Sequence, residues 1–546
     1  MKIVECVPNI SDGRNPEVYN AVAQAAAAVT GVELLDVDPG QETNRTVITF
    51  VGEPEAVLEG AFAVVKRSFE LVDMQTHHGA HGRQGATDVC PFVPVSGVTM
   101  DDCVELSKRL GKRVGEELGI PVFLYEYAAT RPERRSLADI RKGEYEALEE
   151  KLKTPEFAPD YGPATFVPGF GAMVTGARKF LVAYNVNLNV TDSRWANRVA
   201  FDVREAGRMV PGPDGTKVQQ PGLLKAVRGM GWTIPEYGCA QVSMNLIDLD
   251  VTPVHVAFDA CDESARERGI RVTGSELVGL LPKSSMLAAG CHYLAKMERS
   301  RGVPESDVIH AAVRSLGLNE VSRFNAKEKI IEEVLAPERP LAALTLQGFA
   351  DETSRDSTAP GGGSVAALAG ALAAALAAMV ANLPHPKAPF AKVRDQLEEV
   401  AIRGQELKQQ LLDAIDEDTW SFQRLMDANK VSGEAKGAAM RAATLGAALV
   451  PLEVTEACPE VVGLCARARE IGMAASASDA GVGAAMARAA ALGAAMNVRI
   501  NLQHMTDDPE AAAMLERADR ALTETTKAAA ALEAEVWSSL GGGELP

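Results

Sequence analysis

The sequence predicts a multidomain protein in which two α/β (α+β sandwich) subdomains precede an all-α helical bundle. Residues 1–180 alternate short β-rich runs with helical stretches, and residues 181–335 repeat this style. Residues 343–546 are dominated by Ala, Leu, Met, Glu and Arg, and a helical period replaces the β-branched runs. Alternating strands and helices are typical of layered α/β folds, whereas small residues on most helix faces favour a closely packed bundle. We expect a proline-containing linker at 336–342 between the two kinds of composition.

Individual elements follow from local composition. Runs of β-branched and aromatic residues predict strands at 2–9, 32–38, 45–52, 89–95, 121–127, 179–188 and 240–250. Helical stretches are expected at 15–29, 54–71, 100–118 and 253–268. Pro163, Pro168 and several glycines predict a long loop after the first set of strands, and the turn formers at 209–222 predict an exposed loop.

Composition excludes some classes of protein. The chain has 546 residues, of which 47% are hydrophobic and 24% charged, as expected for globular domains. Its formal net charge of -19 argues against nucleic-acid binding, which needs a concentrated basic face. Residues 365–383 carry no charge and have the length of a membrane span, but alanine contributes little to insertion. We therefore expect close helix packing rather than a membrane protein.

Cysteine usage indicates the compartment. The eight cysteines are scattered and none forms a CxxC pair, so neither a zinc ribbon nor a redox motif is predicted. A low cysteine density in a long chain is typical of free thiols in a reducing cytosol. The N-terminus has no basic segment followed by an apolar run, so we expect no signal peptide and a cytoplasmic protein.

The densest polar cluster lies at 77–85, with the sequence HHGAHGRQG. His77 and His81, or His78 and His81, have the spacing of metal ligands on a helix, but each glycine would destabilise a helix by ~1 kcal/mol relative to Ala. We expect a loop and no metal site, because no cysteine set or HExxH motif accompanies it. Glycines let the backbone approach a ligand, imidazole moves protons near neutral pH, and the Arg83 guanidinium can hold a carboxylate. The alternative is a histidine that only hydrogen-bonds a turn.

Polar residues also follow predicted strands. Asp36 and Asp38 end one strand, and Asn44, Arg45 and Thr46 begin the next. Ligand sites in α/β folds often lie beyond strand ends, although these residue types also form turns unaided.

Several segments, in order, resemble glutamate formiminotransferase. They are ECVPNISDGRN, DVDPGQETNRTVITFVG, HGAHGRQGATDVCPFVPV, YGPATFVPGFGAMVTGARKFLVAYNVNL, AQVSMNLIDLDVTPVH and GSELVGLLP. The later segments APGGGSVAALAGALAAAL, LLDAIDEDTWSF and ASASDAGVGAA resemble the cyclodeaminase half of the same bifunctional family. The resemblance covers essentially the whole chain.

The resemblance implies two successive reactions. Formiminoglutamate and tetrahydrofolate would give glutamate and 5-formiminotetrahydrofolate, which would then close to 5,10-methenyltetrahydrofolate and release ammonia. Tetrahydrofolate would be a cosubstrate, with its polyglutamates as further substrates and no metal. The resemblance also implies a homo-oligomer, with a ring of dimers in the family.

The resemblance also implies site residues. It places the catalytic histidine at His81 and the cyclodeaminase aspartate at Asp418. It places the folate-contacting loop at Gly162, Pro163, Ala164, Thr165, Phe166, Val167, Pro168, Gly169, Phe170 and Gly171.

The chemistry of transfer agrees with this assignment. N5 of tetrahydrofolate must lose a proton and the departing glutamate nitrogen must gain one, so one histidine can act as base and then acid. Residue type makes Arg83 and Arg45 candidate clamps for the carboxylates of glutamate, and Asp38 a candidate to orient a protonated group. The glycines and prolines of the loop would bring the backbone near a flat pterin, on which Phe166 or Phe170 could stack. The loop's alternative role is a connector between subdomains.

The segment around Asp418 predicts a buried carboxyl group. On a helix, Leu411, Ile415, Phe422 and Leu425 form one apolar stripe that includes Asp418. Asp413, Asp416 and Glu417 fall on more polar faces, so Asp416 and Asp418 should not form a dyad. Burial raises the pKa of a carboxyl group, which suits a proton shuttle, but a buried aspartate can also cap a neighbouring helix.

Two further features of the last domain leave alternatives open. Pro360, three glycines and Ser364 precede an Ala-rich helix, where N–H groups could bind an anion or simply start a packed helix. Ser478, Asp479 and the segment 497–501 match family segments, whereas Met473 stands where family members often carry Asn. Rival functions are a formyl-folate transferase or cycloligase, a methenyltetrahydrofolate cyclohydrolase, and a non-catalytic folate-binding protein.

Overall fold

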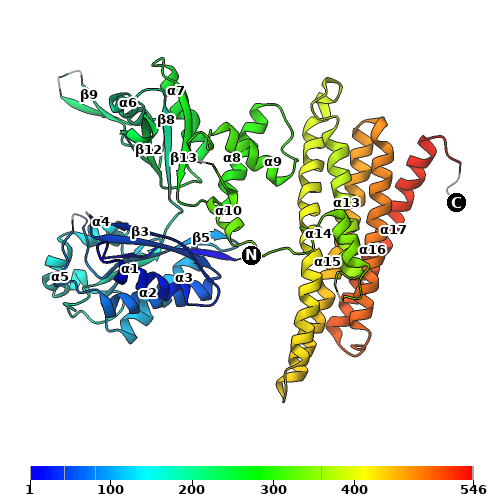
Figure 1. Ribbon diagram of the computed structural model, residues 1–546, viewed down its shortest axis with the longest axis horizontal. Coiled ribbons are helices and arrows are strands. Elements are labelled where there is room, and N and C mark those ends of the chain that lie inside the picture. Colours follow the sequence, from blue (N-terminus) through cyan, green and yellow to red (C-terminus); the bar gives the residue numbers. More distant parts are fainter. Residues whose placement is uncertain are drawn as a thin grey trace. The chain divides into compact units, whose positions relative to one another are not determined.

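The computed structural model describes residues 2–41, 43–79, 82–212, 214, 216–321, 323–357 and 359–543 (Figure 1). The chain forms two compact units. The first comprises Met1–Ala288 and Leu316–Ala336, and the second comprises Ala289–Ser315 and Pro337–Pro546. The predicted order of two α/β regions followed by a helical bundle is confirmed.

A seven-stranded sheet forms the first half of the first unit. Its strands are β1 (Ile3–Cys6), β2 (Asn9–Ile10), β3 (Val32–Gly40), β4 (Arg45–Gly52), β5 (Thr87–Ser96), β6 (Val122–Glu126) and β7 (Met173–Ala177). The sheet is antiparallel except at β7, which lies parallel to both β5 and β6. The five expected strands of this half are confirmed. However, β7, which follows the predicted loop 162–171, was not predicted.

Helices cover both faces of this sheet unequally. The helices α1 (Pro16–Ala27), α2 (Pro54–Leu71) and α3 (Met100–Glu117) lie on one side in Figure 1. They enclose a core that includes Val4, Cys6, Ile48 and Phe50. Because strand side chains alternate, Glu5 in β1 and Arg45 in β4 point to the opposite face. There α4 (Leu137–Arg141) and α5 (Glu144–Leu152) cover the β5–β7–β6 end.

A four-stranded antiparallel sheet forms the second half of the first unit. Its order is β11 (Val227–Ile234), β12 (Cys239–Leu246), β8 (Val182–Leu188) and β13 (Val272–Val278). The helices α6 (Ser193–Val203) and α7 (Val254–Arg266) pack against it. The predicted loop at 209–222 is exposed as expected. It nevertheless pairs as a hairpin of β9 (Arg208–Pro211) and β10 (Lys217–Gln220), because turn residues separate two short extended runs. The helices α10 (Ala326–Lys329) and α11 (Ile331–Val334) end the unit, while α8 (Lys283–Lys296) continues into the second.

Five long helices run side by side in the second unit (Figure 1). They are α13 (Gly362–Asn382), α14 (Arg394–Asn429), α15 (Ala435–Ile471), α16 (Ala477–Leu502) and α17 (Pro509–Ser539). Two shorter helices of this unit, α9 (Glu305–Ser315) and α12 (Leu346–Thr353), precede them in the sequence. Small residues let their axes approach: a Cβ on Gly404 would lie 3.0 Å from the Cβ of Ala378.

Among the described residues one helix, α13, is long and apolar enough to cross a membrane. Of its most apolar stretch, 61% is buried inside the protein, as in the core helix of a bundle. The close packing that we expected for 365–383 is therefore observed.

Candidate functional sites

The histidine cluster lies on a connection between α2 and β5. Its described residues, 77–79 and 82–85, are not helical, which agrees with the predicted loop. Ala80 and His81, the predicted catalytic histidine, lie outside the described residues. Gly79 packs against the backbone of Thr43, where any side chain would clash, so the loop lies close to the β3–β4 connection.

His77 anchors this loop. Its Nε2 lies 2.8 Å from the carbonyl oxygen of Asn44, and its Nδ1 accepts a hydrogen bond of 3.2 Å from Nε of Arg83. A nitrogen that accepts from a guanidinium cannot also carry a proton, so the ring is neutral and Nε2–H donates to Asn44. Burial also lowers the pKa of His77, which likewise favours the neutral ring. His77 is therefore a structural histidine.

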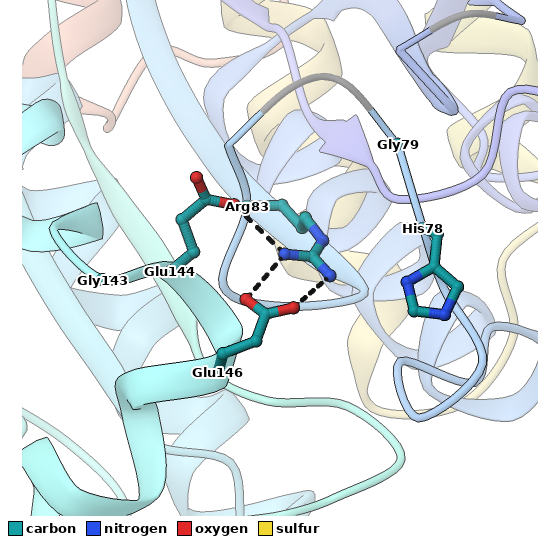
Figure 2. A pocket seen from close by; sticks show the side chains of 6 residues that line it. All are labelled: His78, Gly79, Arg83, Gly143, Glu144 and Glu146. Carbon is teal, nitrogen blue, oxygen red and sulfur yellow. Dashed lines mark hydrogen bonds and ion pairs between the residues drawn. The ribbon is translucent and has the colours of Figure 1, made fainter.

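Arg83 lies at the centre of a polar pocket of about 390 Å³, lined also by His78, Gly79, Gly143, Glu144 and Glu146 (Figure 2). The two ends of its guanidinium donate to the Glu146 carboxylate at 2.9 and 2.8 Å, and one of them also donates to Glu144 at 3.1 Å. The hydrogen bonds to Glu146 raise the pKa of Arg83, and the same contact lowers the pKa of Glu146. The donors of Arg83 are thus engaged within the chain, and a substrate carboxylate would have to displace Glu146.

Arg45 lies in a separate polar cluster. Its Nε donates to Oδ1 of Asn9 at 2.9 Å, and its Nη1 lies 3.7 Å from the carboxylate of Asp88. Burial lowers the pKa of Arg45 to about 10. Asp88 also forms an ion pair with Arg141. Asp38 is exposed and lies opposite Val47 in the sheet, so it shares the face of the sheet that carries Arg45.

The predicted folate loop, 162–171, is tied by its backbone to the histidine loop. The N–H of Ala86 donates to the carbonyl of Phe170 at 2.8 Å, and Gly85 bridges Gly171. Gly162 and Gly171 have φ of +78° and +83°, which favour glycine at both ends. The structure therefore joins the loop 162–171 to the histidine loop, although the sequence predicted no contact between them.

The two phenylalanines of this loop differ. Phe170 is 0% exposed and packs on Phe69 with ring centroids 5.9 Å apart, so its ring is not available to a ligand. Phe166 is half-buried and packs on Tyr145 at 5.4 Å, and the Tyr145 hydroxyl donates to the carbonyl of Pro168 at 2.6 Å. Of the two stacking candidates, the structure leaves Phe166.

Asp418 lies at the N-terminus of α13. Its carboxylate accepts from the backbone N–H of Ser364 and lies 3.3 Å from Oγ of the same residue, whose hydroxyl also donates to the carbonyl of Ile415 at 2.9 Å. A Cβ on Gly363 would overlap the carboxylate, so only glycine allows this approach. Burial raises the pKa of Asp418, and the two bonds from Ser364 oppose the rise. The glycine-rich start of α13 therefore does bind an anion, and that anion is Asp418.

The apolar stripe around Asp418 differs from the prediction in two respects. Leu411 and Ile415 are buried as expected, but Phe422 is 42% exposed, because it lies one turn beyond the start of α13 and cannot pack on that helix. Asp416 is not on a polar face: it is buried and accepts from the backbone N–H groups of Leu341 and Ala342 at 2.9 and 3.0 Å. The two aspartates bind different segments, so they form no dyad.

The position that departs from the family pattern, Met473, caps a short turn before α16. Its carbonyl accepts from the N–H of Ser476 at 3.0 Å, and its sulfur lies 2.8 Å from Nζ of Lys387. On α16, Asn497 donates to the carbonyl of Gly493 at 2.8 Å, and its amide nitrogen would lie 3.3 Å from a Cβ on Gly362. Asn497 therefore borders the same helix start as Asp418.

Sequence reasoning missed several residues of the first site. Asn9, Asp88, Tyr145 and Glu146 contact predicted site residues, and Arg141 pairs with Asp88, yet none of the five stands out in the sequence. Among the described residues no group of three or more His, Cys, Asp or Glu side chains could hold a metal ion.

Comparison with known proteins places these sites in context. Family models match three consecutive regions: "Formiminotransferase domain, N-terminal subdomain" at 3–178, "Formiminotransferase domain" at 183–336 and "Formiminotransferase-cyclodeaminase" at 345–520. Formimidoyltransferase-cyclodeaminase of Rattus norvegicus is 42% identical over 93% of this chain and 94% of its own length. Glutamate formimidoyltransferase of Streptococcus pyogenes serotype M1 is 41% identical over 54% of this chain and 93% of its own.

A solved structure is also similar. The crystal structure of formiminotetrahydrofolate cyclodeaminase from Thermotoga maritima has 27% sequence identity and a TM-score of 0.34, and the match covers 36% of this chain and 98% of that one. The three family models and the near-complete coverage of full-length relatives agree with each other, and the chain belongs to the formimidoyltransferase-cyclodeaminase family.

Proposed function

We propose that this chain is a bifunctional enzyme of one-carbon metabolism. Its first unit transfers the formimino group of N-formimino-L-glutamate to N5 of tetrahydrofolate and releases glutamate. Its second unit closes 5-formiminotetrahydrofolate to 5,10-methenyltetrahydrofolate and releases ammonia. The relatives named above carry these activities in their names, and one of them matches nearly the whole chain.

One structural observation supports the proposal: the candidate residues for the two reactions lie in two separate units. In the first unit, a histidine loop is bonded to a glycine-rich loop over a sheet face that carries arginines. In the second, the carboxyl group of Asp418 lies against the start of α13 with a raised pKa. Two chemically distinct steps that each move a proton need two such sites.

In the transfer step, we assign His81 to take the proton from N5 as N5 attacks the formimino carbon. The same imidazole then returns the proton to the glutamate nitrogen as the carbon–nitrogen bond breaks. The loop 162–171 supplies backbone groups and the Phe166 ring to the pterin. Arg45 and Arg83 are assigned to substrate carboxylates, and Asp38 to a protonated group on the same sheet face as Arg45.

In the ring closure, N10 attacks the amidine carbon and loses its proton to Asp418. The substrate reacts as an amidinium, whose nitrogen already carries two hydrogens. The carboxyl group delivers the N10 proton to this nitrogen, which leaves as ammonia, and the positive charge stays on the methenyl product, so protons and charge balance over the step. A raised pKa makes Asp418 a better base toward N10 than an ordinary carboxylate. Fixed contacts with Ser364 hold the group in place during both transfers.

We also propose a cytoplasmic homo-oligomer, of which a ring of dimers is one form. All eight cysteines are free, which agrees with a reducing compartment. Leu492, Met496 and Ile500 form an exposed apolar stripe on α16, four residues apart, with exposed fractions between 46% and 59%. Light scattering of a Met496→Glu, Ile500→Glu double variant is expected to give a smaller particle than the wild type. An unchanged mass would remove this stripe from the subunit contact.

The decisive test is one assay with formiminoglutamate and tetrahydrofolate that follows ammonia and the methenyl chromophore together. We expect both products in equal amounts. Activity with formyltetrahydrofolate in place of both substrates would favour a formyl-folate enzyme, and tight folate binding without turnover would favour a binding protein.

A further inference from the structure

A second group of charged residues lies on the first sheet, apart from the Arg83 pocket. We call it the basic cluster, and it comprises Glu5 of β1, Arg45 of β4, Asp88 of β5, Arg141 of α4 and Arg178, which follows β7. The five residues come from five different elements, so the fold rather than local sequence assembles them. The sheet brings Arg178 beside Glu5: Glu5 lies opposite Val93 of β5, and the N–H of Arg178 donates to the carbonyl of the neighbouring Phe92 at 3.1 Å. Burial raises the pKa of Tyr125 in β6 to about 12, and the charges of Arg178 and Arg141 both oppose the rise.

Positive charge exceeds negative charge in the basic cluster. Asp88 is 1% exposed and pairs with two guanidinium groups, those of Arg45 and Arg141, whose side chains are 15% and 14% exposed. Within the described part of the chain, Arg178 makes no ion pair, and its guanidinium donates to the backbone carbonyl of Lys179 at 3.0 Å. Glu5 balances little of this charge, because burial raises its pKa to about 7. Buried charge of one sign is costly unless a partner of opposite sign is supplied.

Several buried polar groups here have no partner among the described residues. They are Nε of Arg141 and both amide atoms of Gln84, whose backbone N–H donates to Asp88 at 2.9 Å. The carboxyl group of Glu5, 5% exposed, likewise makes no hydrogen bond to the described chain. Buried polar groups in proteins are nearly always satisfied, so unpartnered donors and acceptors along β5 and its neighbours indicate a polar ligand.

We propose that the basic cluster binds the side-chain carboxylate of the formiminoglutamate substrate through Arg141 and Arg178, which leaves the other carboxylate to Arg83, while Glu5 accepts a hydrogen bond from its formimino nitrogen. The inference rests on the proposed transferase function and names the residues that select a dicarboxylate. Formiminoglutamate carries two carboxylates and one basic amidine, which matches an excess of guanidinium groups beside one unpartnered carboxyl group. Asp88 positions Arg141 and Arg45 and does not touch the substrate.

The test compares two formimino donors at saturating tetrahydrofolate. One is formiminoglutamate, and the other is N-formimino-L-glutamine, in which an amide replaces the side-chain carboxylate. The wild type is expected to prefer the dicarboxylate in kcat/KM by roughly 10–100-fold, the range of a charge-assisted hydrogen bond. In Arg141→Gln and in Arg178→Gln the KM for formiminoglutamate should rise at least about tenfold and this preference should largely disappear. The KM for tetrahydrofolate should stay within about twofold.

Matched variants separate binding from folding. Arg194→Gln removes an arginine of the same unit that pairs with Asp192 at the surface. This variant should leave the dicarboxylate preference and the KM for formiminoglutamate unchanged. Arg141→Lys keeps the charge beside Asp88 and should retain most of the preference if Arg141→Gln fails to fold. Ring closure of supplied 5-formiminotetrahydrofolate, measured on each variant, reports an intact second unit.

Calorimetric titration with formiminoglutamate alone distinguishes this inference from the proposed function. Binding by the wild type that Arg141→Gln and Arg178→Gln weaken supports the basic cluster even if no transfer occurs, in which case the proposed activity is what fails. A dicarboxylate preference and a formiminoglutamate affinity that survive in both variants would overturn the inference.

Discussion

The two candidate sites hold their charged groups by different means. In the first unit, side chains do so: Glu146 and Glu144, which are 62% and 46% exposed, neutralise Arg83. In the second unit, the start of a long helix does so, because Ser364 binds Asp418 with its backbone as well as its hydroxyl. Exposed ion pairs contribute only ~0–1 kcal/mol and can exchange for a substrate group, whereas backbone donors of a helix cannot move independently. The comparison predicts an adaptable first site and a rigid second one.

Crossed substitutions test whether the sites are independent. His81→Ala should abolish formimino transfer, by roughly 10²–10⁴-fold or more, and spare ring closure of supplied 5-formiminotetrahydrofolate. Asp418→Asn should block ammonia release and leave transfer intact. The two half-reactions are measured separately, by glutamate release and by the methenyl chromophore. Transfer that persists in His81→Ala would remove that residue from the mechanism, and an unaffected ammonia rate would do the same for Asp418.

The rigidity of the second site predicts a large effect of one methyl group. A Cβ at Gly363 would overlap the Asp418 carboxylate, so Gly363→Ala should slow ring closure by roughly 10–100-fold through a displacement of the order of 1 Å. Gly361→Ala is the matched control, since nothing lies within 4 Å of its added Cβ and its φ is -107°. Equal rates in the two variants would show that the position of Asp418 is not critical.

The adaptable first site predicts a moderate effect for Arg83→Ala. Its guanidinium must leave Glu146 to receive a substrate carboxylate, so the net loss should be small: about a tenfold rise in the KM for formiminoglutamate. Arg109→Ala removes a comparable ion pair, with Glu55 between α2 and α3, and should not change this KM. A KM unaltered by Arg83→Ala would exclude the clamp and leave Arg83 as a partner of His77 and α5.

The smallest expected effect concerns stability and pH. Because the folded-state pKa of Asp418 is raised, its contribution to stability is fully present below its ordinary pKa of 3.8 and is lost as the pH rises through the higher value. The melting temperature of the wild type should therefore fall relative to that of Asp418→Asn between about pH 4 and neutrality. Asp427→Asn, on the same helix, is the control: Lys430 lowers the pKa of Asp427, so the contribution of that group is lost only below its ordinary pKa of 3.8, and this variant should run parallel to the wild type above pH 4. Calorimetry over this pH range measures both, and an Asp418→Asn curve that also runs parallel to the wild type would contradict the assignment.

The sequence predicted the fold where an element carries its own pattern. The strands β4 and β5 and the helices α1–α3 follow from periodicity within one segment. In contrast, β7 has five residues, one of them glycine, and it is a strand because β5 and β6 lie on either side of it. Phe422 was expected inside because a helical pattern does not show where the neighbouring helix begins.

The candidate sites also differ in how far the sequence alone could predict them. Asp418 could be found from one helix face, because apolar neighbours surround it in the sequence. The basic cluster could not, because Glu5 and Arg141 look like ordinary charged residues until the sheet and α4 place them together. The role of Asp416 was missed because its partners lie some 75 positions earlier in the chain.

The backbone bonds from Leu341 and Ala342 to Asp416, together with the ion pair of Arg339 with Asp413, attach the end of the connecting segment firmly to α14. The segment is therefore a tether whose far end is already part of the helical fold. A separately produced cyclodeaminase half should consequently start upstream of Arg339, and residues inserted before that point should lengthen the tether without disturbing Asp418. A cut made after Ala342 would instead strip the buried Asp416 carboxylate of both its donors and loosen the helix that carries the ring-closing group.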